Sequence, residues 1–210
     1  MAAVGRASEG SIGDGFIAAP HTVRPDPNLG SLMGSYQRGD IAAATLLIER
    51  LSPQLHRFFL VQSASRVDAD DLLQETWLQI HKVRHTYRVG EPVLPWFYAI
   101  ARHVRVDHYR KAIRMAAREE RLSETPEPIA GATSGSHDPE NLESLLAPLP
   151  ASQREVIQML KVAGMSLEEV ARATSSSVGS VKQKAHRAYE SLRARLGGVT
   201  VGKGRTGGLS

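Results

Sequence analysis

The sequence contains no cysteine. This absence excludes disulfide bonds, thiolate catalysis, cysteine-ligated zinc and a cysteine-based redox sensor within the chain, and it suits a reducing cytosol. Long apolar runs are missing as well, since no stretch approaches the ~18 residues of a membrane-spanning helix. The first residues show no basic segment followed by an apolar one, so we expect no secretory signal. These absences together predict a cytoplasmic protein.

Recognisable catalytic constellations are also lacking. The chain has no phosphate-binding glycine loop in a strand–turn–helix context and no Gly-x-Ser-x-Gly elbow. His81 and His85 have the spacing of two metal ligands on one helix face, but no carboxylate lies between them. The neighbouring Lys82 and Arg84 would repel a cation. We therefore expect no enzyme activity, no bound metal, no cofactor and no small-molecule substrate.

The charged residues that are present are segregated along the chain. Residues 31–115 carry a net charge of +4, from 12 basic and 8 acidic residues, and residues 148–210 carry +6, from 10 and 4. Between them, residues 116–147 carry −5, from 2 basic and 7 acidic residues. Two basic blocks separated by an acidic one suggest two surfaces that contact a polyanion and a connector that does not.

Hydrophobic residues make up 41% of the chain and recur mostly at helical spacing. The sequence predicts an all-α fold with two small helical domains joined by a flexible acidic linker, the C-terminal domain being a helix-turn-helix. The expected divisions are a disordered tail over residues 1–30, an N-terminal domain over 31–115, the linker over 116–147, the C-terminal domain over 148–196 and a disordered tail over 197–210.

Local signals place several helix boundaries in the N-terminal domain. Asp40 and Asp68 are expected to cap two helices, because an aspartate side chain can accept a hydrogen bond from a free amide of the first turn. Pro53 is expected to open a separate helix, since proline suits the first turn. Ile48 is expected to face inward.

The stretch from Ser166 to Arg195 reads as two helices joined by a tight turn. Ser166 and Glu169 have the spacing of a capping box. On the second helix, an apolar stripe at 3.6-residue spacing comprises Val178, Val181, Ala185, Ala188, Tyr189 and Leu192. Ser175 stands where such a turn usually has glycine, so a left-handed conformation there would be slightly strained.

The opposite face of that second helix is polar and basic. With the preceding turn it presents Ser176, Ser177, Ser180, Lys182, Gln183, Lys184 and Arg187. Such groups read base edges and hold phosphates when a helix lies in the major groove of DNA. The alternative is an amphipathic helical hairpin with a solvated basic face.

A second informative helix begins near Pro95. Trp96, Phe97 and Tyr98 are consecutive, so at 100° per residue at least one must face outward. Basic residues follow them: Arg102, Arg105, Arg110 and Lys111. Aromatic rings and cations are what a single-stranded nucleic acid site requires. The alternative is a core helix with a solvated basic side.

Three stretches in this order resemble bacterial RNA polymerase sigma factors of the extracytoplasmic-function type, in the sigma-70 family. They are DADDLLQETWLQIHKV, PWFYAIARHVRVDHYRK and LPASQREVIQMLKVAGMSLEEVARATSSSVGSVKQKAHRAYESLR. With the N-terminal helices, the resemblance covers roughly residues 31–196. It implies a factor that binds core RNA polymerase and directs promoter-specific transcription initiation, held by an anti-sigma protein that is often membrane-bound until a stress signal releases it.

The resemblance also implies roles for individual residues. Polymerase contacts fall on Asp70, Asp71, Gln74, Glu75 and Gln79. Recognition and melting of the −10 element fall on Tyr87, Arg88, Trp96, Phe97, Tyr98, Arg102, His103, Arg105, Arg110 and Lys111. Recognition of the −35 duplex falls on the seven polar and basic residues of the turn and second C-terminal helix given above.

The chain departs from the family at His103, where an asparagine is frequent, and at Ser175. Two other readings stay open from the residues. One is a helix-turn-helix repressor or activator that does not depend on core polymerase, and the other is a protein that binds an anti-sigma factor but has lost promoter binding. The sequence leaves open whether the two domains pack together or lie apart.

Overall fold

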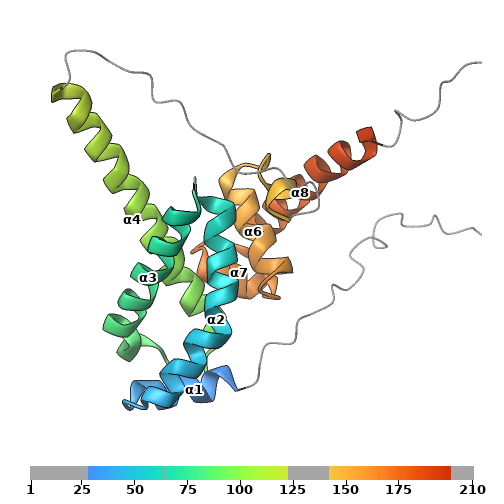
Figure 1. Cartoon of the computed structure of the whole chain (residues 1–210). Coiled ribbons are helices and arrows are strands. Elements are labelled where there is room, and N and C mark those ends of the chain that lie inside the picture. Colours follow the sequence, from blue (N-terminus) through green and yellow to red (C-terminus); the bar gives the residue numbers. More distant parts are fainter. Residues whose placement is uncertain (1–27, 64, 123–141, 200–210) are drawn as a thin grey trace, which may run out of the picture.

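The computed structural model describes residues 28–63, 65–122 and 142–199, and within these ranges every regular element is helical. The predicted tails therefore lie almost wholly outside the described residues, as does most of the predicted linker. Figure 1 shows two groups of helices in contact. No helix in the described part of the chain is long and apolar enough to cross a membrane.

The first group comprises the N-terminal helices. They are α1 (Leu29–Gln37), α2 (Ile41–Gln62), α3 (Arg66–Val83), the 3₁₀ turn η1 (Arg84–Thr86) and α4 (Val93–Leu122). Each of the four α-helices packs on the next one along the chain: α1 on α2, α2 on α3, and α3 on α4. The short turn η1 and a loop connect α3 to α4. The helix α4 continues to Leu122, past residue 115, so its C-terminal half extends beyond α3 (Figure 1).

Two of the predicted helix boundaries in this group are wrong. Pro53 lies inside a continuous α2, where both Pro53 and Glu49 are exposed and water can satisfy the carbonyl that proline leaves without a donor. Ser65, not Asp68, caps α3: its Oγ accepts a hydrogen bond from the Asp68 amide at 3.1 Å. The predicted cap at Asp40 is confirmed, since its Oδ1 accepts from the Ala43 amide at 3.1 Å.

The second group comprises α5 (Leu142–Leu146), α6 (Ala151–Lys161), α7 (Leu167–Ala173) and α8 (Val178–Val199). The capping box is confirmed: Ser166 Oγ accepts from the Glu169 amide at 3.1 Å, and Glu169 Oε2 accepts from the Ser166 amide at 2.8 Å. Ser175 has φ of +50°, the left-handed conformation expected of it. Helices α7 and α8 with this turn form the helix-turn-helix.

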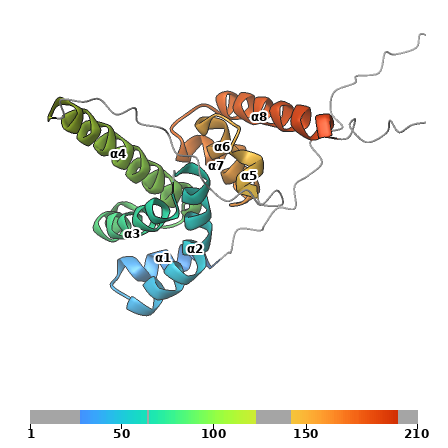
Figure 2. The same ribbon diagram turned by 45° about the horizontal axis from the view of Figure 1, so that its top comes forward.

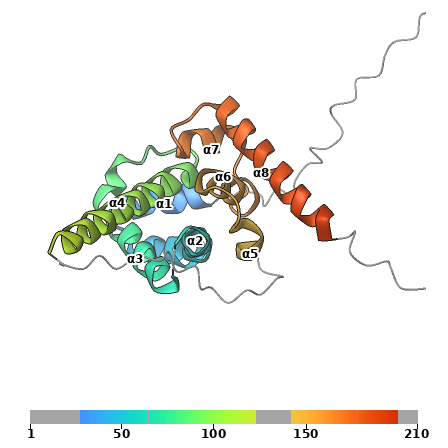
Figure 3. The same cartoon turned by 90° about the horizontal axis from the view of Figure 1, so that it is seen from above.

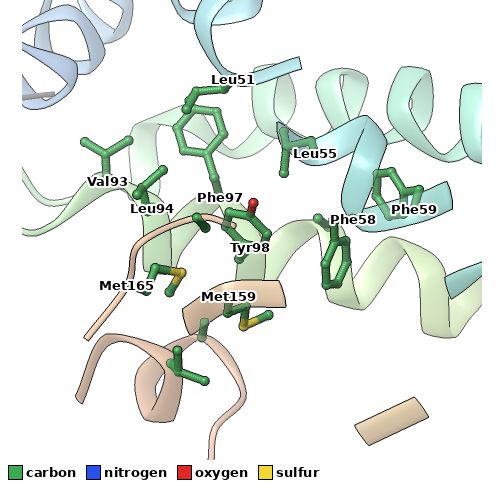
Figure 4. Packing of buried hydrophobic residues seen from close by; sticks show 14 of the residues in the cluster. Leu51, Leu55, Phe58, Phe59, Val93, Leu94, Phe97, Tyr98, Met159 and Met165 are labelled. Carbon is green, nitrogen blue, oxygen red and sulfur yellow. The ribbon is translucent and has the colours of Figure 1, made fainter. Parts of the chain in front are cut away.

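The two groups pack against each other, which answers the question that the sequence left open. Helix α6 lies against α2, and α7 lies against α4, as Figures 2 and 3 show from two further directions. Figure 4 shows Met159 and Met165 from the second group beside Leu94 and Tyr98 on α4. All four side chains are buried, so one hydrophobic core runs across both groups.

Candidate nucleic-acid and polymerase interfaces

Helix α8 carries the predicted −35 residues on its outer side. Its inner stripe is confirmed at Val181, Ala185 and Ala188, which are buried where α8 meets α6 and α7. On the other side, Ser177, Lys182, Gln183 and Arg187 are exposed, and Ser176, Ser180 and Lys184 are half-buried. The buried stripe thus fixes which side chains face solvent, and those that do are hydrogen-bonding or cationic.

Two of the predicted −35 residues also stabilise the turn. Ser177 Oγ accepts a hydrogen bond from the Ser180 amide at 3.2 Å, which is the geometry of an N-cap for α8. Ser176 Oγ lies 2.7 Å from Thr174 Oγ1. These hydroxyls already have protein partners, so the longer side chains of Lys182, Gln183 and Arg187 are the ones free to extend toward a ligand.

The aromatic residues at the start of α4 lie mostly inside the protein. Phe97 is fully buried and Tyr98 is 2% exposed, so in this structure neither ring is open to the DNA contact that the sequence predicts for it. Phe97 stacks edge-to-face on Trp77 of α3, with ring centroids 5.6 Å apart, and Tyr98 stacks on Phe58 of α2 at 5.3 Å. Burial raises the pKa of the Tyr98 hydroxyl. Trp96 is half-buried and is the residue of the three that faces partly outward.

Two side chains, those of Tyr87 and Gln37, hold the loop before α4 in place. Tyr87 is 4% exposed and packs its ring on Trp96, and its hydroxyl donates to the Glu91 carbonyl, so Tyr87 supports the loop rather than presenting itself to DNA as predicted. Gln37 Nε2 donates to the carbonyls of Arg84 and Tyr87, both at 2.7 Å. Sequence reasoning missed Gln37, because nothing local marks a helix residue that reaches a distant loop.

The exposed part of that loop spans residues 88–92. Arg88, Val89 and Gly90 all face solvent, and Gly90 has φ of +96°, which a side chain would strain. Arg88 is thus the predicted −10 residue in the loop that a ligand can reach.

The predicted −10 cations on α4 fall into two sets. His103, Arg110 and Lys111 are exposed, and Asp107 lies between the first two, with Oδ2 3.0 Å from His103 Nε2 and Oδ1 3.7 Å from Arg110 Nη1. Arg102 and Arg105 are half-buried and face Glu155 on α6. All five basic residues therefore lie on α4, but of these only His103, Arg110 and Lys111 are open to solvent.

The five predicted polymerase contacts on α3 do not share one face. Asp70 Oδ1 lies 2.8 Å from His56 Nε2 on α2. Asp71 and Glu75 are exposed beside α4, where they line a small hollow with Lys111. The remaining two residues are Gln74, which is exposed, and Gln79, which is half-buried.

Gln74 borders a groove that sequence reasoning missed. The groove has a volume of about 600 Å³ and lies between α3 and the α1–α2 corner. Its apolar lining includes Leu78 (56% exposed), Ile41 (81%) and Ile48 (44%), so the expected inward position of Ile48 is wrong. A helical wheel cannot distinguish residues that line an apolar groove from residues that face the core, so helical spacing placed Ile48 inward and did not reveal the groove.

Comparison with known families now identifies the chain. Residues 47–115 match the model of sigma-70 region 2, and residues 140–192 match that of sigma-70 region 4. A Myxococcus xanthus protein, RNA polymerase sigma factor CarQ, is 33% identical over 157 residues, which cover 72% of this chain and 87% of CarQ. The extracytoplasmic-function (ECF) sigma factor SigF of Caulobacter vibrioides is 30% identical over 159 residues, covering 75% and 88%. The chain is an ECF sigma factor of the sigma-70 family.

Solved structures agree with this assignment. The sigma factor RpoE of Bartonella quintana, solved with the anti-sigma factor NepR, has a TM-score of 0.60 and 25% identity, and the match covers 72% of this chain and 95% of RpoE. CnrH, at 22% identity and the same TM-score, shares the fold over 80% of this chain and 97% of its own. Sigma factors bind core RNA polymerase and direct it to promoters, so the chain is a transcription initiation factor and the polymerase performs the catalysis.

Proposed function

We propose that this sigma factor reads duplex −35 DNA with α8. The observation that carries the proposal is the exposed set Lys182, Gln183 and Arg187, seated above the buried stripe of Val181 and Ala185 in a helix-turn-helix. A helix placed so can enter a major groove, with its long polar side chains toward base edges and phosphates.

Run-off transcription with purified core polymerase on a genomic promoter pool tests this role. Discrete start sites that require this protein are expected, and alignment of their upstream sequences would give both promoter elements. Lys182→Ala and Arg187→Ala should each weaken promoter binding by about 1–3 kcal/mol. Arg57→Ala, which removes an equal charge from an exposed position on α2, is the control. If Lys182→Ala and Arg187→Ala both initiate transcription as well as the control variant, α8 does not read the promoter.

For the −10 element, the residues that support capture of a melted strand are Arg88, Trp96, Arg102, His103, Arg105, Arg110 and Lys111. They combine a half-buried aromatic ring with cations on one helix and its preceding loop, the composition of a single-strand binding surface. Phe97, Tyr98 and Tyr87 hold that surface in place from within. Arg110→Ala and Lys111→Ala should reduce permanganate reactivity of promoter thymines while leaving polymerase binding intact.

Core polymerase docking is proposed for the α3 groove and its polar border. Leu78 and Ile41 expose apolar surface there and Gln74 adds a hydrogen-bonding group, which suits a helical partner with an apolar stripe. Leu78→Glu should abolish capture of core polymerase in a pull-down. Val67→Glu, at a 69% exposed position on the same helix, is the matched control. Equal capture by both variants would remove the groove from the interface.

An anti-sigma factor is the further partner that we propose, by analogy with the B. quintana relative that was solved with NepR. The chain would then act in the cytoplasm as part of a stress response, where release from the antagonist starts transcription. Affinity capture from unstressed cells should recover one antagonist in stoichiometric amount. Recovery of polymerase alone would contradict this regulation.

A further inference from the structure

The contact between the two groups of helices involves the same arginines that the proposed −10 site uses. Arg102 Nε lies 3.1 Å and Arg105 Nη2 3.8 Å from Oε1 of Glu155, on α6. The Glu155 side chain is only 6% exposed, so this carboxylate sits inside the contact between α6 and α4. A carboxylate at this position presents the same chemistry as a DNA phosphate: a negative oxygen between two guanidinium groups.

A second ion pair joins α7 to the loop that precedes α4. Arg172 Nη1, on α7, lies 3.0 Å from Oε2 of Glu91, next to the exposed loop residues Arg88 to Gly90. The C-terminal group therefore reaches both parts of the proposed −10 surface, the helix and the loop, and helix α7 packs against α4.

We propose that Glu155 occupies the phosphate site of the −10 surface, so that this one carboxylate must leave Arg102 and Arg105 before they can hold a phosphate of single-stranded DNA. The inference rests on the proposed role of Arg102 and Arg105. It describes an intramolecular competitor: α6 delivers one carboxylate to the site that a nucleic acid phosphate would take.

The charges at this contact do not balance, which makes the site available to a stronger anion. Arg154 lies beside Arg105, and burial together with this proximity lowers the pKa of the Arg154 guanidinium. Burial likewise lowers the pKa of Arg105, and Glu155 opposes that shift. Two guanidinium groups, those of Arg102 and Arg105, thus face one carboxylate, with a third cation beside Arg105. The polyanionic backbone of DNA supplies more negative charge than Glu155 alone.

The closing contact also lacks ideal geometry. Three buried polar atoms of this contact have no well-aligned hydrogen-bond partner. They are Glu155 Oε1, Arg102 Nε and Arg105 Nε. Their attraction is an ion pair without directed hydrogen bonds. A buried charge is costly to desolvate unless such bonds compensate it, so this contact holds the groups together less firmly than a fully satisfied one.

Full-length protein labelled with a fluorophore pair tests the competition. The chain has no cysteine, so Val67→Cys and Ala194→Cys, both at exposed positions, place one dye on each group. Glu155→Gln removes the charge with little change in volume and should lower energy transfer at a salt concentration where the parent remains closed. Glu190→Gln, which removes an equal charge from an exposed site on α8, should leave transfer unchanged. Equal transfer in all three proteins overturns the proposal.

Binding of a labelled, mixed-sequence single-stranded DNA gives the second readout. Because apparent affinity scales with the fraction of open molecules, Glu155→Gln should bind at least about tenfold more tightly than the parent. Adding Arg102→Ala and Arg105→Ala to Glu155→Gln should remove that gain. An open Glu155→Gln protein that gains no affinity refutes the competition.

Two further measurements separate failure of this inference from failure of the −10 assignment. Run-off transcription by holoenzyme with Arg102→Ala and Arg105→Ala tests the assignment itself: full activity would refute the role of the arginines in DNA capture, and the competition with it. Loss of activity combined with unchanged energy transfer in Glu155→Gln would refute the competition alone. If Glu155→Gln fails to fold by circular dichroism, Gln158→Ala replaces it: this variant removes the hydrogen bond from Gln158 Nε2 to the Arg57 carbonyl, which joins α6 to α2 at 3.1 Å beside the Glu155 contact, and it should lower energy transfer in the same way.

Discussion

Replacing Phe97 by alanine separates a structural role of the aromatic cluster from a role on DNA. Phe97 is fully buried, and its ring packs edge-to-face on Trp77 and on Trp96, with centroids 5.6 and 5.3 Å away. Truncating a buried phenylalanine to alanine costs about 3–5 kcal/mol, from lost transfer energy and the cavity that is left. We expect a loss near the upper end, because two aromatic contacts disappear together.

For a chain of this size each kcal/mol corresponds to about 2–4 °C in the melting temperature, so a loss of about 5 kcal/mol should lower the melting temperature of Phe97→Ala by roughly 10–20 °C. Thermal unfolding followed by circular dichroism measures the shift. Phe97→Leu keeps most of the apolar volume and should lose far less stability, and it should still support promoter melting at a temperature where it is folded. If instead Phe97→Ala melts like the parent but fails to open promoter DNA, the ring acts on DNA and the burial argument is wrong.

Three further changes test local features of the fold. Ser175→Gly relieves a left-handed residue at φ of +50° and should raise the free energy of unfolding by about 0.5–1 kcal/mol, whereas Ser175→Ala should give no gain in a urea titration. Ser166→Ala removes the cap of α7 and should cost about 1 kcal/mol in the same titration; an unchanged midpoint would mean that the capping box contributes nothing. Gln37→Leu leaves the carbonyls of Arg84 and Tyr87 without their donor, so it should cost about 1–3 kcal/mol and speed amide exchange in residues 84–91, while exchange elsewhere that rises equally would contradict a local role.

Features set by near neighbours in the chain could be predicted from sequence. The capping box at Ser166, the cap at Asp40 and the left-handed Ser175 each depend on residues within a few positions, and the structure confirms all three. The buried stripe of α8 at Val181, Ala185 and Ala188 followed in the same way from helical periodicity, whereas Tyr189, which was predicted to belong to it, is 36% exposed. These features fix the helix-turn-helix and, with it, which α8 residues face solvent.

Features set by packing between distant segments could not be predicted. Whether Phe97 and Tyr98 face outward depends on Trp77 and Phe58, which lie on other helices and fill the space around them. The incorrect helix start at Pro53 has the same origin, because a proline inside a helix is tolerated or not according to what surrounds the freed carbonyl. Helical periodicity identifies the apolar face of a helix, but it does not show how many other helices pack around that helix.

The contact between the two groups shows the same limit most clearly. On α6, Glu155 and Gln158 are 5% and 2% exposed, although their residue types predict solvent exposure. The polar partners of both side chains lie in the N-terminal group: Glu155 faces Arg102, and Gln158 bonds to the Arg57 carbonyl and to Gln62.

Polar residues at such a contact have a physical consequence. An interface made only of groups such as Met159 and Tyr98 would be held by burial of apolar area and would resist opening. Side chains that water or DNA can satisfy equally well lower the cost of separating the groups, as is typical of contacts between domains that move. The mixture of apolar and ionic contacts therefore fits a closed state that is stable alone and yields to a polyanion, and the arginines released on opening are the ones that the polyanion needs.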